Sequence, residues 1–176
     1  MMNPDSARVL QPAEWDLHSA VWTAWPSHAP YWEGHIEAAR KDVAGLVKAI
    51  AQPVPGRPAP ELVHLWVDGE EALQSAREAL GDAQVDLIPE PFGDIWFRDI
   101  APIFVKRPDG SLEYRTFRYN GWGGKYLMEN DETVAPRIAK STGLNGLAVD
   151  MVFEGGGLDV DGTGLGLTTA SCLLNP

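Results

Sequence analysis

The order of apolar segments in the first half of this 176-residue chain is the feature that most limits its fold. Short β-prone apolar runs predict strands at residues 20–25, 62–67 and 85–89. Apolar side chains at helical spacing predict amphipathic helices at residues 35–51 and 70–80. Strands that alternate with helices are typical of an α/β fold. The prolines between residues 53 and 60 predict a stiff surface loop, which we interpret as an insertion rather than a domain linker.

The second half of the chain adds two predicted hairpins. Each has an Asp-Gly pair at its turn, and the two hairpins occupy residues 103–117 and 158–169. A helix at residues 131–142, limited or kinked by Pro136, and a strand at residues 147–153 lie between them. The order strand, helix, strand and hairpin therefore recurs, as a repeat of pattern rather than of residues.

An acidic residue precedes each hairpin, Asp99 before the first and Glu154 before the second. If such modules pack around one axis, these two carboxylates would approach one centre. Two carboxylates near a Trp suit a delocalised cation, because a carboxylate accepts two parallel N–H bonds from a guanidinium and the aromatic ring adds a cation–π contact. The glycines at 155–157 would let the backbone approach such a ligand, or they would form a plain β-bulge.

The segment Gly93–Pro102 concentrates charged and aromatic side chains. In an extended conformation Asp94, Trp96 and Arg98 would share one face, because side chains alternate along a strand. Asp99 would then lie on the other face, where the chain enters a buried strand. A buried carboxylate has to be paired, hydrogen-bonded or functional. Asp99 is therefore expected to pair with Arg98, to cap a turn, or to serve a chemical role.

Two further residues have more than one interpretation. Trp122 lies in the glycine-rich loop 120–126, where it would line a pocket or anchor the loop on the core. Cys172 follows an apolar strand with no histidine near it in the sequence, which favours a small buried apolar residue over a nucleophile. It is the one cysteine, so no disulfide can form within the chain, and a reducing cytoplasm is the simplest setting.

The formal net charge of −11 and the pI near 4.7 argue against nucleic acid and anionic membranes as partners, since both need basic patches. The same charge is compatible with a small cationic substrate. The opening residues lack the regions of a signal peptide, and no apolar run approaches the length of a membrane span. The four histidines lack metal-ligand spacing, so we expect neither a metal nor another cofactor.

Five stretches of the chain, taken in order, resemble the agmatine deiminases, in the bacterial peptidylarginine deiminase-like branch of the guanidine-modifying superfamily. They are residues 12–15 with 20–26, 94–99, 120–126, 154–156 and 167–176. The resemblance implies a pentein-type, pseudo-fivefold α/β propeller, of which residues 1–176 would be a partial domain, the first half. It also implies hydrolysis of agmatine to N-carbamoylputrescine and ammonia, in which a Cys thiolate attacks the guanidinium carbon and a His activates water.

By motif position, the resemblance implies that Asp99 holds the guanidinium nitrogens and that Trp96 packs on the substrate. Glu154 and Trp122 are implied as further substrate-binding residues. The family's Gly-His-Val-Asp segment and nucleophilic Cys belong to a second half, and neither is in this sequence. Cys172 matches a different family cysteine. We therefore expect this chain alone to be inactive or nearly so.

Other functions remain open at this stage. A half-propeller could be a non-catalytic module that binds another chain or itself, because open strand edges and apolar faces favour assembly into a homo-oligomer. Asp99 and Glu154 could also be the acid and base of a glycosidase-like site. Within the family the substrate could be peptidyl arginine or a free arginine-like compound. The missing signal peptide and the opening residues favour agmatine, and hence polyamine synthesis in the cytoplasm.

Overall fold

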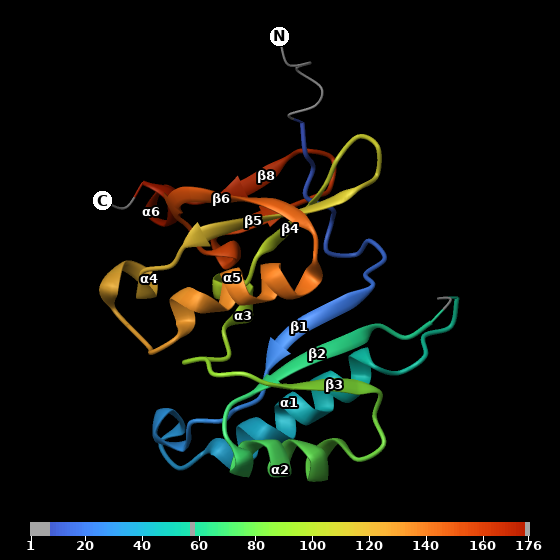
Figure 1. Ribbon diagram of the computed structural model, residues 1–176, viewed down its shortest axis with the longest axis vertical. Coiled ribbons are helices and arrows are strands. Elements are labelled where there is room, and N and C mark those ends of the chain that lie inside the picture. Colours follow the sequence, from blue (N-terminus) through green and yellow to red (C-terminus); the bar gives the residue numbers. More distant parts are fainter. Residues whose placement is uncertain (1–7, 57–58, 175–176) are drawn as a thin grey trace. The chain divides into compact units, whose positions relative to one another are not determined.

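The computed structural model describes residues 8–56 and 59–174, and the chain divides into two compact units (Figure 1). Residues Leu17–Phe97 form one unit, called here the parallel unit. The segments Met1–Asp16 and Arg98–Pro176 form the other, called here the mixed unit. Within the described residues, none of the helices has the length and apolar character needed to cross a membrane.

The parallel unit is a three-stranded sheet in the order β1-β2-β3, and all of its strands are parallel. The strands are β1 (Ala20–Ala24), β2 (Leu62–Val67) and β3 (Val85–Pro89), and the crossover helices are α1 (Ile36–Ile50) and α2 (Glu70–Leu80). A short 3₁₀ turn, η2 (Ala29–Trp32), precedes α1. The helices cover the same face of the sheet (Figure 1), because two right-handed crossovers in one direction place both helices on one side. The predicted strands and helices of this part are confirmed.

Apolar packing between the sheet and the two helices forms the core of the parallel unit. Alternate residues of β2 point into it, and Val63, Leu65 and Val67 are at most 1% exposed. The cluster is completed by Trp25 and by one face of each helix: Ala44, Val47 and Ala51 from α1 and its end, and Ala72, Leu73, Ala76 and Leu80 from α2. Burial of these stripes stabilises the helices more than their intrinsic propensity does.

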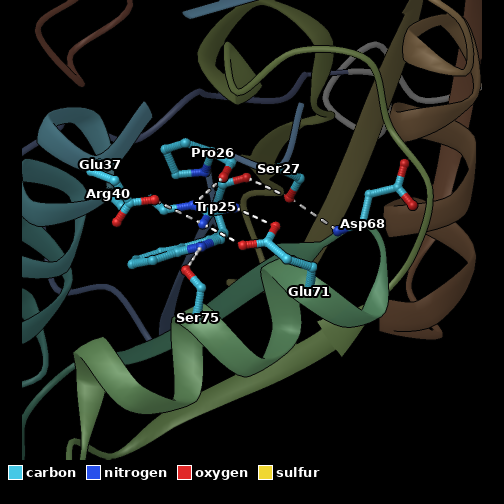
Figure 2. Close-up of polar contacts among 8 residues, drawn as sticks. All are labelled: Trp25, Pro26, Ser27, Glu37, Arg40, Asp68, Glu71 and Ser75. Carbon is cyan, nitrogen blue, oxygen red and sulfur yellow. Dashed lines mark hydrogen bonds and ion pairs between the residues drawn. The ribbon is translucent and has the colours of Figure 1, made fainter. Parts of the chain in front are cut away.

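A buried arginine ties α1 to α2 above this core (Figure 2). Arg40 is 5% exposed, and its two terminal nitrogens donate to the Glu71 carboxylate at 2.7 and 2.8 Å. Its Nε donates to the carbonyl of Pro26 at 3.0 Å, so one side chain also holds the end of β1. Trp25 donates from Nε1 to Ser75 Oγ at 3.2 Å. A planar guanidinium can make all three Arg40 bonds at once, whereas a lysine could not.

We predict that Arg40→Ala lowers the free energy of unfolding by about 2 kcal/mol, since it removes charge-assisted bonds and leaves the Pro26 carbonyl without this donor. Urea unfolding measures the loss. Lys41→Ala is the matched control, because Lys41 is exposed on the same helix. Equal effects from the two substitutions would contradict this account of Arg40.

The mixed unit contains a three-stranded sheet in the order β4-β5-β6, with β4 antiparallel and β6 parallel to β5. These strands are β4 (Ile103–Lys106), β5 (Leu112–Arg118) and β6 (Asn145–Val152). Helix α5 (Asp131–Thr142) packs on β5, and its buried residues Val134, Ala135, Ile138 and Ala139 share one face (Figure 1). The helix continues through Pro136. Both predicted hairpins are confirmed, the second as β7 (Leu158–Val160) with β8 (Gly166–Thr168).

The segment that leads into β4 differs from the extended conformation considered for it. Residues Phe97–Ile100 form a helical turn, α3, preceded by a bond from Phe97 N–H to the Ile95 carbonyl at 2.7 Å. Phe97 and Ile100 are 4% and 3% exposed, and their spacing of three suits a helical turn with both side chains buried. The alternation of faces expected for Asp94 to Asp99 is therefore wrong.

Candidate functional site

Asp99 lies in α3 of the mixed unit, where its two carboxylate oxygens accept different N–H groups. Oδ2 accepts from the Trp122 indole at 3.1 Å, and Oδ1 accepts from the Gly156 backbone at 3.0 Å. The Arg98 guanidinium is directed instead to Glu14 Oε1 at 2.7 Å. The Glu14 carboxylate, and more weakly Asp99 itself, raise the pKa of Arg98. Asp99 is thus held between two N–H donors from distant segments of the chain.

Trp122 belongs to a tight loop whose backbone is shaped around it. One helical turn, α4 (Gly121–Gly124), holds Trp122 in a left-handed conformation with φ 53° and ψ 53°. The Asn120 side chain accepts from Gly123 N–H at 2.8 Å, which closes the turn. The Trp122 ring makes edge-to-face contacts with Tyr119 and Tyr126, at centroid distances of 5.3 and 6.2 Å. The loop therefore fixes the indole that donates to Asp99.

Glu154 is the second carboxylate of this group. It precedes a 3₁₀ turn, η3 (Gly155–Gly157), and its pKa is raised by burial and then by the neighbouring negative charge of Asp99. The mixed unit therefore brings Asp99, Trp122 and Glu154 together, and the convergence of the two carboxylates follows from the fold. Like charges this close favour a ligand that carries a positive charge.

The glycines after Glu154 are required by close approach. A Cβ at Gly155 would lie 2.4 Å from the Arg98 carbonyl oxygen, and one at Gly156 would lie 2.1 Å from Asp99 Oδ1. Both distances are far inside van der Waals contact, so a side chain at either position would displace α3. At Gly157 the nearest atom would be the Cys172 Cβ at 3.4 Å, an ordinary contact.

We predict that Gly156→Ala lowers the free energy of unfolding by about 2 kcal/mol, because the new methyl group forces the Asp99 carboxylate away from its backbone donor. Gly157→Ala is the matched control and should change stability far less. Urea unfolding compares the two variants. Equal stability of both variants would show that Asp99 is not in contact with η3.

We predict that Glu154→Gln raises stability at pH 7 and raises it less at pH 5. A carboxyl whose pKa is higher in the folded than in the unfolded chain destabilises the fold where it is ionised, and this cost grows as pH rises from the unfolded value of about 4.3 through the folded value. Urea midpoints at both pH values measure the gain. Glu129→Gln, at an exposed position, is the control, and a pH-independent effect at Glu154 would contradict the prediction.

Trp96 belongs to the parallel unit, whereas the other three residues belong to the mixed unit. Its side chain is 56% exposed. Asp94 also accepts from the Ile95 backbone N–H at 2.7 Å. Burial raises the pKa of Asp94, while the Ile95 N–H and the nearby His28 oppose that rise. The motif analysis did not identify His28, because its link to Asp94 depends on the fold.

Cys172 is exposed in this chain, on the short turn α6 (Ala170–Leu173), so the expectation of a buried apolar residue is wrong here. The Thr169 hydroxyl donates to its sulfur at 3.0 Å. Across the described part of the chain, no group of three or more His, Cys, Asp or Glu side chains is arranged to hold a metal ion.

The model of the Porphyromonas-type peptidyl-arginine deiminase family matches residues 10–176, which is nearly the whole chain. The chain therefore belongs to this family. The resemblance inferred from the five sequence stretches is confirmed, and so is the α/β fold class.

Among individual proteins, the chain is similar to the agmatine deiminases. It is 34% identical to the enzyme of Stutzerimonas stutzeri over 93% of its own length, and 32% identical to that of Ectopseudomonas mendocina. The solved agmatine deiminase of Enterococcus faecalis superposes on 98% of the chain with a TM-score of 0.82 at 27% identity. The chain spans only 44–46% of the length of these relatives, and it corresponds to part of their pentein-type fold.

Proposed function

We propose that this chain carries the substrate-orienting groups of a hydrolase that releases ammonia from a guanidine, with agmatine as the substrate. The observation that carries the proposal is the fixed Asp99 carboxylate beside Glu154. Each Asp99 oxygen uses one lone pair on an N–H of the protein, which leaves a second one free to accept. The two free positions match the parallel N–H bonds of a guanidinium fork.

The second carboxylate gives this site its preference for charge. Glu154 is disfavoured as an anion by burial and by Asp99, and a bound guanidinium would relieve both effects. Trp96, three positions before Asp99 in the sequence, would add its exposed ring to the planar cation. Trp122 would act by holding Asp99, since its indole N–H is committed to that carboxylate.

The reaction would begin with attack of a Cys thiolate on the guanidinium carbon that Asp99 holds in place. The bond from the guanidinium carbon to one of its nitrogens would break, and that nitrogen would leave as ammonia. A water activated by a His would then release the ureido product and regenerate the thiolate. We assign the nucleophile and this His to a segment that corresponds to the part of the relatives' sequences that this chain does not match. The product from agmatine would be N-carbamoylputrescine, which places the reaction in polyamine synthesis in the cytoplasm.

The experiment combines this chain with the remaining part of the Stutzerimonas stutzeri enzyme and measures ammonia release from agmatine. We predict that Asp99→Asn lowers kcat/KM by about a hundredfold or more, because an amide cannot accept the guanidinium on both sides. Cys172→Ser should leave activity nearly unchanged. Comparable losses would show that the chemistry is wrongly placed, and multiple turnovers by the chain alone would overturn the assignment of the nucleophile.

A second candidate function is a non-catalytic interaction module. Among the described strands, β6 and β8 each pair on one side only. Leu147 of β6 is 57% exposed, Leu167 of β8 is 67% exposed, and Leu165 in the turn before β8 is 62% exposed. Apolar edges of this kind favour association with another chain or a second copy. Sedimentation that shows concentration-dependent dimers, without agmatine turnover in the combined enzyme, would favour this function over the first.

A further inference from the structure

The Arg98 side chain lies beside the carboxylate that the proposed function assigns to the substrate. A Cβ at Gly156 would lie 2.1 Å from Asp99 Oδ1 and 3.4 Å from Arg98 Cγ, so both side chains border the same point of η3. Arg98 ends in a guanidinium, which is the group that the proposed site would accept from its substrate. The long arginine stem could bring this guanidinium to Asp99, where it would compete with the substrate.

Glu14 gives the Arg98 guanidinium a different partner. Glu14 Oε1 accepts from Arg98 Nη1 at 2.7 Å, a distance typical of a charge-assisted hydrogen bond. The two Asp99 oxygens accept instead from the Trp122 indole and from the Gly156 backbone N–H. Arg98 is therefore directed to Glu14, although Asp99 is its neighbour in the sequence.

The segment that carries Glu14 is held at two places within the mixed unit. Leu10 exchanges two backbone hydrogen bonds with Lys106 of β4, at 2.9 and 2.8 Å. Ala13 is 4% exposed, and a Cβ at Gly162, in the turn of the second hairpin, would lie 2.7 Å from the Ala13 backbone nitrogen. Gly162 also has a φ of 77°, which favours glycine. The backbone before Glu14 is thus tied both to β4 and to the hairpin turn.

The ion pair between Glu14 and Arg98 is exposed to solvent. The Arg98 side chain is 57% exposed and the Glu14 side chain 47%. A pair of this kind contributes little to the free energy of unfolding, because water screens both charges. Its larger consequence is the direction of the guanidinium. An Arg98 without Glu14 would keep its charge and would lie beside the free lone pairs of Asp99.

We propose that Glu14 is a positioning residue that keeps the Arg98 guanidinium away from Asp99, so that the Asp99 carboxylate stays open to a guanidine substrate. This inference rests on the proposed function for the identity of the ligand. Glu14 acts through Arg98 and does not itself contact the substrate. Loss of Glu14 should therefore impair the site only while Arg98 is present, and removal of both side chains should restore it.

The first test follows the Trp122 indole N–H of the chain by NMR, because this group donates to Asp99 and responds to what else the carboxylate binds. Its signal, one of seven, is assigned by its loss in Trp122→Phe. Glu14→Ala should shift the signal, and the double variant Glu14→Ala/Arg98→Gln should return it toward its original position. Glutamine keeps the Cγ that borders Gly156 but lacks the guanidinium. A signal that ignores Glu14→Ala, or that stays shifted in the double variant, would overturn the proposal without any substrate.

The second test measures agmatine hydrolysis by the chain combined with the remaining part of the Stutzerimonas stutzeri enzyme. Glu14→Ala should raise KM about fivefold and leave kcat nearly unchanged, because saturating substrate displaces a competing side chain. The double variant Glu14→Ala/Arg98→Gln should restore KM to near its original value. A loss of kcat, or a raised KM that persists in the double variant, would overturn the positioning role. If none of these proteins hydrolyses agmatine, the proposed function fails, while the Trp122 signal still decides whether Glu14 keeps Arg98 from Asp99.

Asp150→Ala is the matched control for both tests. It breaks another exposed ion pair of the mixed unit, between Arg118 Nε and Asp150 Oδ1 at 2.9 Å, and it should leave the Trp122 signal and KM unchanged. Glu14→Gln keeps the length of the side chain and one acceptor, so it should produce the same changes as Glu14→Ala at a smaller size. It decides the outcome if Glu14→Ala lowers the urea midpoint far more than Asp150→Ala does, and an unshifted Trp122 signal in Glu14→Gln would then overturn the proposal.

Discussion

The interaction on which the mixed unit depends is the pair of hydrogen bonds accepted by Asp99. One carboxylate joins α3 to the Trp122 loop and to the turn after Glu154, which are segments 23 and 57 residues away. Gly156 is required there because any side chain would occupy the space of the carboxylate. The same contact brings Glu154 next to Asp99 and disfavours its charge. The ionised Glu154 carboxylate therefore costs stability in this fold.

The parallel unit is stabilised by different interactions. Its sheet and two helices are held by a continuous apolar cluster and by the Arg40 contacts, so the loops at the carboxyl ends of its strands have a rigid support. These loops carry His28, whose Nε2 donates to the Phe92 carbonyl, and Asp94, whose carboxylate accepts from the Ile95 N–H.

Elements whose signals are local could be predicted from the sequence. Helical spacing of apolar residues located α1 and α2, and the Asp-Gly pairs located both hairpin turns, because neighbouring residues decide these structures. The α3 turn escaped prediction because the burial of Phe97 and Ile100 overrode the local pattern. The ion pair between Arg98 and Glu14 was not predicted either, because Glu14 lies 84 residues away and the adjacent Asp99 was the simpler choice.

The sequence by itself determined the α/β class, the family and the residue types suited to a guanidinium, because periodicity and motif order do not depend on distant contacts. Only the tertiary structure decided how those residues are used. It placed Asp99 between two N–H donors, put Glu154 within reach of its charge, and left Cys172 exposed. Hydrogen bonds and electrostatic shifts act over a few ångströms between segments far apart in the chain, and folding alone sets those distances.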